Sequence, residues 1–210
     1  MAKSEHKIKW EKLSNEEDME AKYIYTDGDI GFKESGLRDY ERLIQNDDLI
    51  KKYLGSFENR TVLEIGCGTG RMTEFMAGAF KKVYAVDISE KMLEAGSKRL
   101  KHLDNIEWIE TDGKRLPIHV QPDLIFSYIV LQHCPLGIIK TILEDAANTI
   151  TEDGLVKVQV RGQEIRQDKW YSGHHFTPSE ITMLANAAGF QVIQIWHDPE
   201  EGRYLWIWGI

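Results

Sequence analysis

The stretch VLEIGCGTGR, residues 62–71, decides the fold because it joins an apolar, β-branched run to a segment of helical period through a glycine-rich turn. Gly66, Gly68 and Gly70 leave bare backbone between the expected strand and the expected helix. A ligand can approach bare backbone closely, and a helix N-terminus can meet an anionic group. The stretch therefore predicts a strand, a ligand-binding loop and a helix in that order.

After this loop, short β-branched or aromatic runs alternate with longer segments of helical period, which is typical of βα units around a parallel sheet. Seven strands are expected, at residues 61–65, 82–87, 106–111, 123–130, 154–160, 190–196 and 203–210. Helices are expected between them, at residues 71–80, 89–101, 136–150 and 178–188. Only residues 197–202 separate the last two strands, too few for a parallel crossover, so an antiparallel hairpin is expected there.

The helix at 178–188 has the clearest start and stop signals. Thr177 is a good N-cap, Pro178 suits the first helical position, and Glu180 completes a capping box. Gly189 is a typical C-terminal stop.

The first 60 residues differ from the rest, since they are polar and carry one convincing amphipathic helix, from about Leu37 to Leu54. The whole chain has 210 residues, which suits one domain. We therefore expect residues 1–60 to form a helical cap or lid attached to the same domain, and residues 61–210 to form the ligand-binding part.

The amino-acid composition limits the kinds of molecule that the chain is expected to bind. The chain has 26 basic and 34 acidic side chains, a formal net charge of −8, so binding to nucleic acid or to an anionic membrane is not expected. Two cysteines cannot supply a disulfide framework, and the longest apolar run, residues 124–131, is too short to span a bilayer. These features predict a cytoplasmic protein with a small-molecule partner.

The loop has an acidic residue, Glu64, then one spacer residue and then the pattern G-x-G-x-G. This arrangement resembles the glycine loop of class I S-adenosylmethionine-dependent methyltransferases. A dinucleotide-binding loop would instead read G-x-G-x-x-G, and Arg71 stands where its third glycine belongs. The resemblance covers about Thr61 to the C-terminus. It implies an α/β fold: a Rossmann-like, doubly wound, seven-stranded and mostly parallel sheet, with helices on both faces and a C-terminal antiparallel hairpin.

The resemblance also implies how the nucleoside part of S-adenosylmethionine is bound. Asp87 ends the second expected strand, where a carboxylate can accept both ribose hydroxyls. Ile88 would then lie on the adenine face. Asp112, followed by Gly113, ends the third strand where the family commonly binds the adenine amino group; the alternative is a carboxylate that caps a loop.

The methionine part of the cofactor carries a carboxylate, an ammonium and a sulfonium, and so needs both donors and acceptors. Glu64 and the strand-end carbonyls near Gly66 and Ser127 suit the ammonium. Arg71 or the first amides of its helix suit the carboxylate, and the alternative for Arg71 is a solvated first-turn residue. Cys67 belongs to the cofactor loop and is expected to be a small buried residue, since no activating His accompanies it.

Methyl transfer from a sulfonium needs chiefly positioning and exclusion of water. His133 lies just past the fourth strand, where the family's acceptor pocket opens, and could take the proton of a hydroxyl acceptor. Its alternative role is a hydrogen bond within the loop. His174 and His175 follow the fifth strand, but chelating carboxylates at suitable spacing are not evident, so no metal is expected.

Two further segments have two interpretations each. The aromatic residues Trp170, Tyr171 and Phe176 either line the acceptor pocket or pack their loop. Residues 23–36 resemble a segment that forms a lid across the cofactor in many small-molecule methyltransferases, and otherwise form an ordinary surface cap.

The sequence thus favours an S-adenosylmethionine-dependent methyltransferase that modifies an oxygen or nitrogen of a small metabolite and releases S-adenosylhomocysteine. The alternatives are a protein methyltransferase and a non-catalytic module that binds S-adenosylmethionine or a nucleotide. A radical mechanism would need three clustered cysteines, and the chain has two. No motif specifies the acceptor or an oligomeric state.

Overall fold

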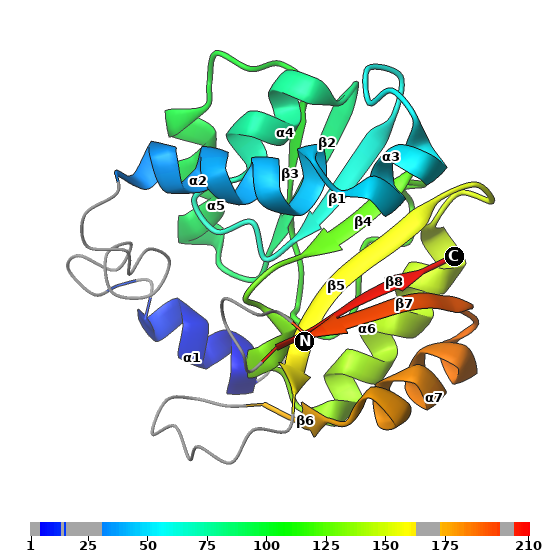
Figure 1. Cartoon of the computed structure of the whole chain (residues 1–210). Helices are drawn as coiled ribbons and strands as arrows, with labels where there is room; N and C mark the ends of the chain where they lie inside the picture. The colour runs from blue at the N-terminus through cyan, green and yellow to red at the C-terminus, as the bar shows by residue number, and fades with distance from the viewer. Residues whose placement is uncertain (1–4, 14, 16–30, 163–172, 198–203) are drawn as a thin grey trace. The chain divides into compact units, whose positions relative to one another are not determined.

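The computed structural model describes residues 5–13, 15, 31–162, 173–197 and 204–210 (Figure 1). The chain divides into two compact units, residues 1–113 and 114–210, and each is described by itself. Within the described residues, no helix combines the length and the apolarity that a membrane crossing requires.

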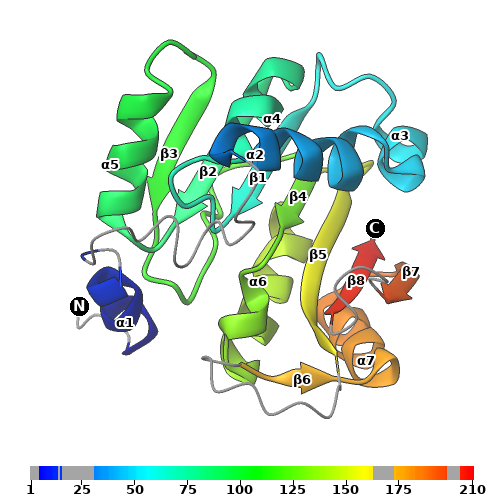
Figure 2. The ribbon, with the colours of Figure 1, turned by 60° about the vertical axis from the view of Figure 1, so that its left-hand side comes forward.

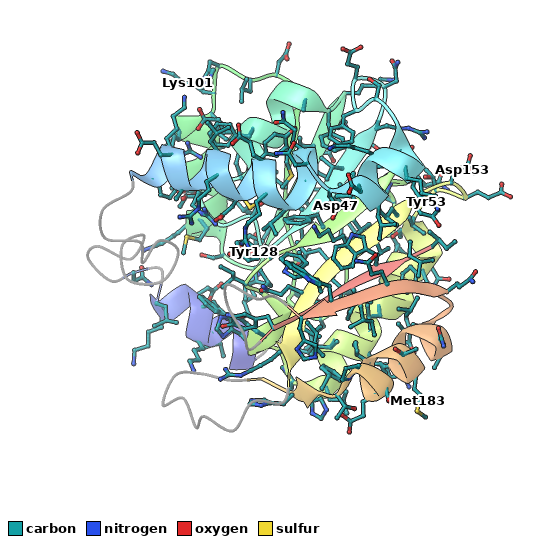
Figure 3. All side chains as sticks on the ribbon, in the orientation of Figure 1. Asp47, Tyr53, Lys101, Tyr128, Asp153 and Met183 are labelled. Carbon is teal, nitrogen blue, oxygen red and sulfur yellow. The ribbon has the colours of Figure 1, made fainter. Side chains whose placement is uncertain are left out.

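The first unit begins with helices. They are α1 (Glu5–Leu13), α2 (Phe32–Tyr40), a π-helical continuation η2 (Glu41–Gln45), and α3 (Asp48–Leu54). The prediction of a single continuous helix from Leu37 to Leu54 is wrong, because α3 is a separate helix. Asp47 (Figure 3) caps α3 by accepting a hydrogen bond from the Ile50 N–H at 2.8 Å, so a new helix starts there.

Three parallel strands form the sheet of the first unit: β1 (Thr61–Ile65), β2 (Lys82–Asp87) and β3 (Ile106–Glu110). β2 lies between the other two and pairs with both. Helix α4 (Thr73–Ala79) connects β1 to β2, and α5 (Glu90–Arg99) connects β2 to β3, beside which it lies (Figure 2). Because the strands are parallel, their carboxyl ends share one edge, and the candidate site is built there.

The second unit contains β4 (Leu124–Ser127), β5 (Leu155–Gly162), β7 (Val192–His197) and β8 (Tyr204–Gly209), with helices α6 (Leu136–Thr149) and α7 (Pro178–Ala188). β4 and β5 are parallel, while β8 is antiparallel to both β5 and β7. The predicted hairpin is therefore confirmed. A two-residue strand β6 (His175–Phe176) pairs with β5 and was not predicted, because two residues carry no periodicity.

The fourth strand is shorter than predicted. β4 ends at Ser127, whereas the apolar run continues to Val130. The backbone turns at Ile129, whose φ of 59° lies in the left-handed region that disfavours β-branched residues. A one-turn 3-10 helix η3 (Leu131–His133) follows.

The start and stop of α7 match the sequence prediction. The Thr177 hydroxyl accepts from the Glu180 N–H at 3.2 Å, and the Glu180 carboxylate accepts from the Thr177 N–H at 2.7 Å. Gly189 ends the helix with a φ of 111°. The predicted fold class is confirmed as well: parallel strands joined by helices, with an antiparallel C-terminal hairpin.

Candidate functional site

The glycine loop has the backbone conformation that its sequence requires. Gly66, Gly68 and Gly70 have φ values of 73°, 56° and 84°, all in the left-handed region that favours glycine. The N–H groups of Gly66 and Cys67 both donate to the Val86 carbonyl, at 2.7 and 3.0 Å. These two hydrogen bonds therefore hold the start of the loop, just after β1, against the end of β2.

Asp87 lies at the rim of this loop, at the end of β2. Its Oδ2 accepts from the Gly68 N–H at 3.0 Å, and its Oδ1 accepts from the Ser89 N–H at 2.9 Å. Desolvation raises the pKa of Asp87, against these main-chain hydrogen bonds and the charge of Lys7. Each carboxylate oxygen has a further lone pair, so this half-buried group can still accept hydrogen bonds from a ligand.

Glu64 is buried near the end of β1, with 6% of its surface exposed. Its carboxylate accepts from the Thr73 hydroxyl at 2.5 Å. Burial raises the pKa of Glu64 to about 7, although the Thr73 hydrogen bond and the positive charge of Arg71 act in the opposite direction. This carboxyl group therefore changes its charge near neutral pH.

Arg71 is not a solvated residue, so that alternative is wrong. Its side chain is buried and donates to Asp39 Oδ2 at 2.6 Å and to Ser35 Oγ at 3.3 Å, both on α2. A methyl group on Gly36 would come within 2.3 Å of the Arg71 carbonyl oxygen, so α2 packs directly on the chain that leaves the loop. Sequence reasoning missed Asp39, because nothing local links two residues 32 positions apart.

Arg99, in the last turn of α5, is a second residue that sequence reasoning missed. Its Nη2 donates to the carbonyl oxygens of Thr69 and Gly70, at 3.1 and 2.5 Å, and its Nη1 donates to Glu74 at 2.7 Å. Its guanidinium also lies over the Phe32 ring, 5.1 Å from the centroid. A basic last turn is ordinary for a helix, so the sequence carried no signal of this role.

The loop also has an apolar support. Cys67 is buried with Ala85 and Leu93, and Trp108 packs against this group. A methyl group on Gly70 or Gly96 would come within 2.9 or 2.6 Å of the Trp108 ring. Burial raises the pKa of the Cys67 thiol well above its ordinary value, which agrees with a structural role rather than a nucleophilic one.

At the end of β3, the Lys7 ammonium of α1 donates to Glu110 at 2.5 Å and to the Thr111 carbonyl at 2.9 Å. Asp112 follows and is exposed, and Gly113 has a left-handed φ of 74°. Ile88, after β2, is half-buried. The ligand contacts expected of Ile88, Asp112 and Gly113 stay predictions.

The two remaining candidates belong to the second unit. Ser127 is fully buried at the end of β4, and His133 is 5% exposed in η3. His133 Nε2 lies 3.1 Å from the side-chain nitrogen of Gln132, so a hydrogen bond within the loop is present. The catalytic role of His133 and the cofactor contact of Ser127 stay predictions.

Some of the loop predictions can be placed only in part. Phe176 is buried in β6, 1% exposed, and packs edge-on against His174 with the ring centroids 4.5 Å apart. Trp170, Tyr171 and residues 23–30 of the predicted lid segment lie outside the described residues. Nowhere in the described ranges do three or more His, Cys, Asp or Glu side chains gather as a metal site would need.

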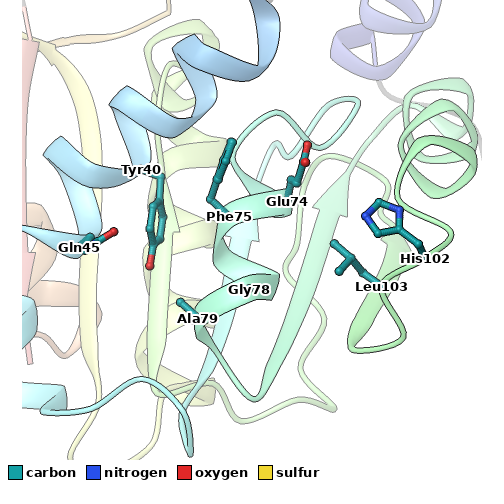
Figure 4. Close-up of a pocket in the computed structure, with 8 residues that line it drawn as sticks. All are labelled: Tyr40, Gln45, Glu74, Phe75, Gly78, Ala79, His102 and Leu103. Atoms are coloured by element: carbon teal, nitrogen blue, oxygen red, sulfur yellow. The ribbon is translucent and has the colours of Figure 1, made fainter.

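A cleft of about 400 Å³ opens beside α4 in the first unit (Figure 4). It is lined by Tyr40, Gln45, Glu74, Phe75, Gly78, Ala79, His102 and Leu103. None of these residues is among the predicted cofactor ligands, although Glu74 accepts a hydrogen bond from Arg99.

Comparison with known proteins places residues 62–154 in a family described as methyltransferase domain. The chain is 35% identical to a demethylmenaquinone methyltransferase of Tropheryma whipplei over 109 residues, 51% of this chain and 44% of that protein. It is 24% identical to an uncharacterized RNA methyltransferase of Clostridium tetani over 139 residues, 56% of this chain and 30% of that protein. The chain thus spans less than half the length of these curated relatives.

Among solved structures, the chain resembles magnesium protoporphyrin IX methyltransferase from Synechocystis, which was crystallised with bound S-adenosylmethionine. The TM-score is 0.68 at 19% identity, covering 100% of this chain and 98% of that one. At this identity the likeness concerns the fold. The fold is that of a class I S-adenosylmethionine-dependent methyltransferase, and the family match covers residues 62–154, which include the glycine loop.

Proposed function

We propose that the chain binds S-adenosylmethionine at the carboxyl ends of β1, β2 and β3 and transfers its methyl group to an oxygen or nitrogen of a small metabolite. The observation that carries this proposal is the Asp87 carboxylate, which the N–H groups of Gly68 and Ser89 hold beside the glycine loop. The product would be S-adenosylhomocysteine.

The residues present fit the nucleoside part of this cofactor. Asp87 has spare lone pairs for the two ribose hydroxyls. The hydroxyls of Thr69 and Ser89, which flank the candidate site, are buried and have no hydrogen-bond partner within the described structure. Ile88 would contact the adenine face, and Asp112 and Gly113 would meet its amino group.

The residues also fit the methionine part. When bound, the cofactor supplies the activated methyl group on its sulfonium. Glu64 offers a carboxylate to the ammonium, and the loop from Gly66 to Gly70 offers main-chain groups. Since Arg71 donates to Asp39, main-chain amides are the better candidates for the cofactor carboxylate. Ser127 would add a contact from β4.

Two features favour a small acceptor. The net charge of −8 opposes binding to nucleic acid and to anionic membranes. One relative is named a demethylmenaquinone methyltransferase, although another is named an RNA methyltransferase. For a hydroxyl acceptor, His133 would take the proton. A protein acceptor and a non-catalytic binding module are the alternatives.

The proposed location is the cytoplasm. The two cysteines are free, as is usual for proteins in that reducing compartment.

Calorimetry with S-adenosylhomocysteine tests the cofactor assignment. We expect Asp87→Asn to weaken binding by about 1.5–3 kcal/mol, because a charge-assisted acceptor is lost. Glu107→Gln, on the half-exposed surface of β3, is the control and should bind as the wild type does. Unchanged affinity in Asp87→Asn would reject the role of Asp87.

A second test compares S-adenosylhomocysteine with NADH, the ligand that a dinucleotide-binding protein would prefer. At a ligand concentration of about 100 times Kd, specific binding adds roughly 2.7 kcal/mol to the free energy of unfolding. We expect S-adenosylhomocysteine to raise the melting temperature and NADH to leave it unchanged. Stabilisation by NADH alone would favour an oxidoreductase instead.

A further inference from the structure

Helix α1 brings a buried lysine to the edge of the sheet at which the candidate site is built. Lys7 is 6% exposed, and a lysine is almost never this buried unless it is paired. Its ammonium donates to the Glu110 carboxylate at 2.5 Å and to the Thr111 carbonyl oxygen at 2.9 Å, at the end of β3. The partners lie 103 and 104 positions away along the chain, so these contacts hold α1 against β3.

A second contact lies just after this helix. The Lys91 ammonium, in the first turn of α5, donates to the side-chain oxygen of Asn15. Asp87 and Ser89 come directly before α5 in the chain. Through Lys7 and Asn15, the N-terminal residues are thus held at the end of β3 and at the start of α5. In Figure 2, α1 lies beyond the carboxyl ends of the parallel strands of this unit, where the nucleoside is proposed to bind.

The pairing of β2 with β3 brings Lys7 close to Asp87. Asp87 and Glu110 are register partners, and the Asp87 carbonyl oxygen accepts from the Thr111 N–H at 3.0 Å. Glu110 and Thr111 are the two residues that Lys7 contacts. Desolvation raises the pKa of Asp87, and the positive charge of Lys7 opposes this shift. The ammonium and the carboxylate therefore interact across the end of the sheet.

Acidic groups on three other elements lie near Asp87. Glu64 is on β1 and Cys67 is in the glycine loop; burial raises the pKa of both side chains, and the charge of Asp87 adds to both shifts. Glu110, the register partner of Asp87, is on β3. An ionised Asp87 thus has acidic neighbours, and α1 brings a positive charge to this group.

We propose that Lys7 is a positioning residue for the cofactor: it holds α1 beside the nucleoside site and supplies the positive charge that favours a ribose-binding carboxylate at position 87. The inference rests on the proposed function, in which Asp87 accepts both ribose hydroxyls. A protonated Asp87 would carry a donor of its own and keep fewer lone pairs for the ribose. Lys7 therefore acts through Asp87 and needs no contact with the cofactor.

The test compares S-adenosylhomocysteine with S-(2′-deoxyadenosyl)homocysteine, which lacks one ribose hydroxyl. Calorimetry at pH 5, 6, 7 and 8 gives the ratio of the two affinities. Both ligands carry the same methionine part, so the titration of Glu64 cancels from this ratio. At pH 8 we expect the wild type to bind S-adenosylhomocysteine about tenfold to a hundredfold more tightly than the analogue. The ratio should fall toward acid pH, because protonation weakens Asp87 as an acceptor for the hydroxyl that the analogue lacks.

The key variant is Lys7→Met, which keeps an unbranched side chain and removes the charge. Because the charge of Lys7 acts to lower the pKa of Asp87, the ratio in this variant should begin to fall at a higher pH than in the wild type. Lys7→Arg keeps the charge and should follow the wild-type curve. Lys7→Gln, which keeps a hydrogen-bond donor without the charge, replaces Lys7→Met if that variant fails to fold. Lys12→Met removes the same charge from an exposed position on α1 and is the control.

The outcomes separate this inference from the proposed function. A wild type that does not bind S-adenosylhomocysteine, or that binds both ligands equally at pH 8, contradicts the proposed function and the inference with it. If the wild type distinguishes the ligands but Lys7→Met gives the same curve, the role of Lys7 alone is overturned, because a purely structural contact would weaken both ligands equally. A shift in Lys12→Met as large as that in Lys7→Met also overturns it, because the effect would then come from net charge.

Discussion

Arg71 and Asp39 form a buried ion pair, with Nη1 and Oδ2 2.6 Å apart and side-chain exposures of 10% and 4%. The pair joins the chain after the glycine loop to α2. Removal of one partner leaves the other charge buried and unpaired, which typically costs about 3–5 kcal/mol. We therefore expect Arg71→Met and Asp39→Leu each to lower the free energy of unfolding by about this amount.

The double variant Arg71→Met with Asp39→Leu should recover much of that loss, because it leaves no unpaired charge. Chemical denaturation of the four proteins measures the coupling. Lys140→Met, which disrupts an exposed pair with Glu144 on α6, is the control and should have little effect. Additive single effects would show that the two side chains do not interact.

Glu64 should make stability depend on pH. Burial raises its pKa to about 7 in the folded protein, whereas an unfolded glutamate titrates near 4.3. Between these values the folded state binds more protons than the unfolded state, so the free energy of unfolding should fall as pH rises. The total loss is about 4 kcal/mol and should be nearly complete at about pH 8.

Glu64→Gln should remove this slope, because glutamine does not titrate, and it should be more stable than the wild type at pH 8. Urea denaturation at pH 5, 6, 7 and 8 measures the effect. Glu107→Gln serves as a half-exposed control and should keep the slope of the wild type. Parallel pH profiles for the wild type and Glu64→Gln would contradict the raised pKa.

Arg99 should act as a positioning residue for the glycine loop. It donates to the carbonyls of Thr69 and Gly70, so Arg99→Met leaves these groups without their charged partner. We expect binding of S-adenosylhomocysteine to weaken by about tenfold, with the KM for the cofactor affected more than kcat. Lys98→Met removes the same charge from the exposed side of α5 and should bind normally. Equal affinities in the two variants would refute the role of Arg99.

His133 should affect turnover rather than cofactor binding. A general base contributes about 10²–10⁴ to the rate, whereas a neutral loop hydrogen bond contributes about 1 kcal/mol to stability. With a hydroxyl acceptor, His133→Ala should therefore keep its affinity for S-adenosylhomocysteine and lose turnover by at least a hundredfold. His174→Ala, in the half-exposed segment before β6, is the control. Turnover of His133→Ala within a few fold of the wild type would assign His133 to loop structure.

Where the sequence carried a complete local signal, its prediction was accurate. Thr177, Pro178 and Glu180 contain a whole helix start within four residues, and α7 begins as expected. The glycine loop is similar, because its three glycines are needed for three left-handed backbone conformations. In both cases the physical cause lies within one short stretch of chain.

Where the cause is distant along the chain, the prediction failed. The apolar run up to Val130 suggested a longer strand, but Gln159 of β5 holds Ile129 in a turn. Arg71 and Arg99 carry no sequence signal of their partners, since these depend on how α2 and α5 pack against the loop. The prediction of one long helix failed for a local reason, the capping side chain of Asp47.

Trp108 links three positions that are far apart in the sequence. Its ring fills the space that a methyl group would need on Gly70, in the glycine loop, and on Gly96, in α5. Neither glycine can gain a side chain while the indole remains, and a smaller residue at 108 would leave a void beneath the loop. Position 70 also needs glycine for its φ of 84°, so positions 96 and 108 are the pair that should vary together in evolution, and any redesign of the support beneath the loop must change these two together.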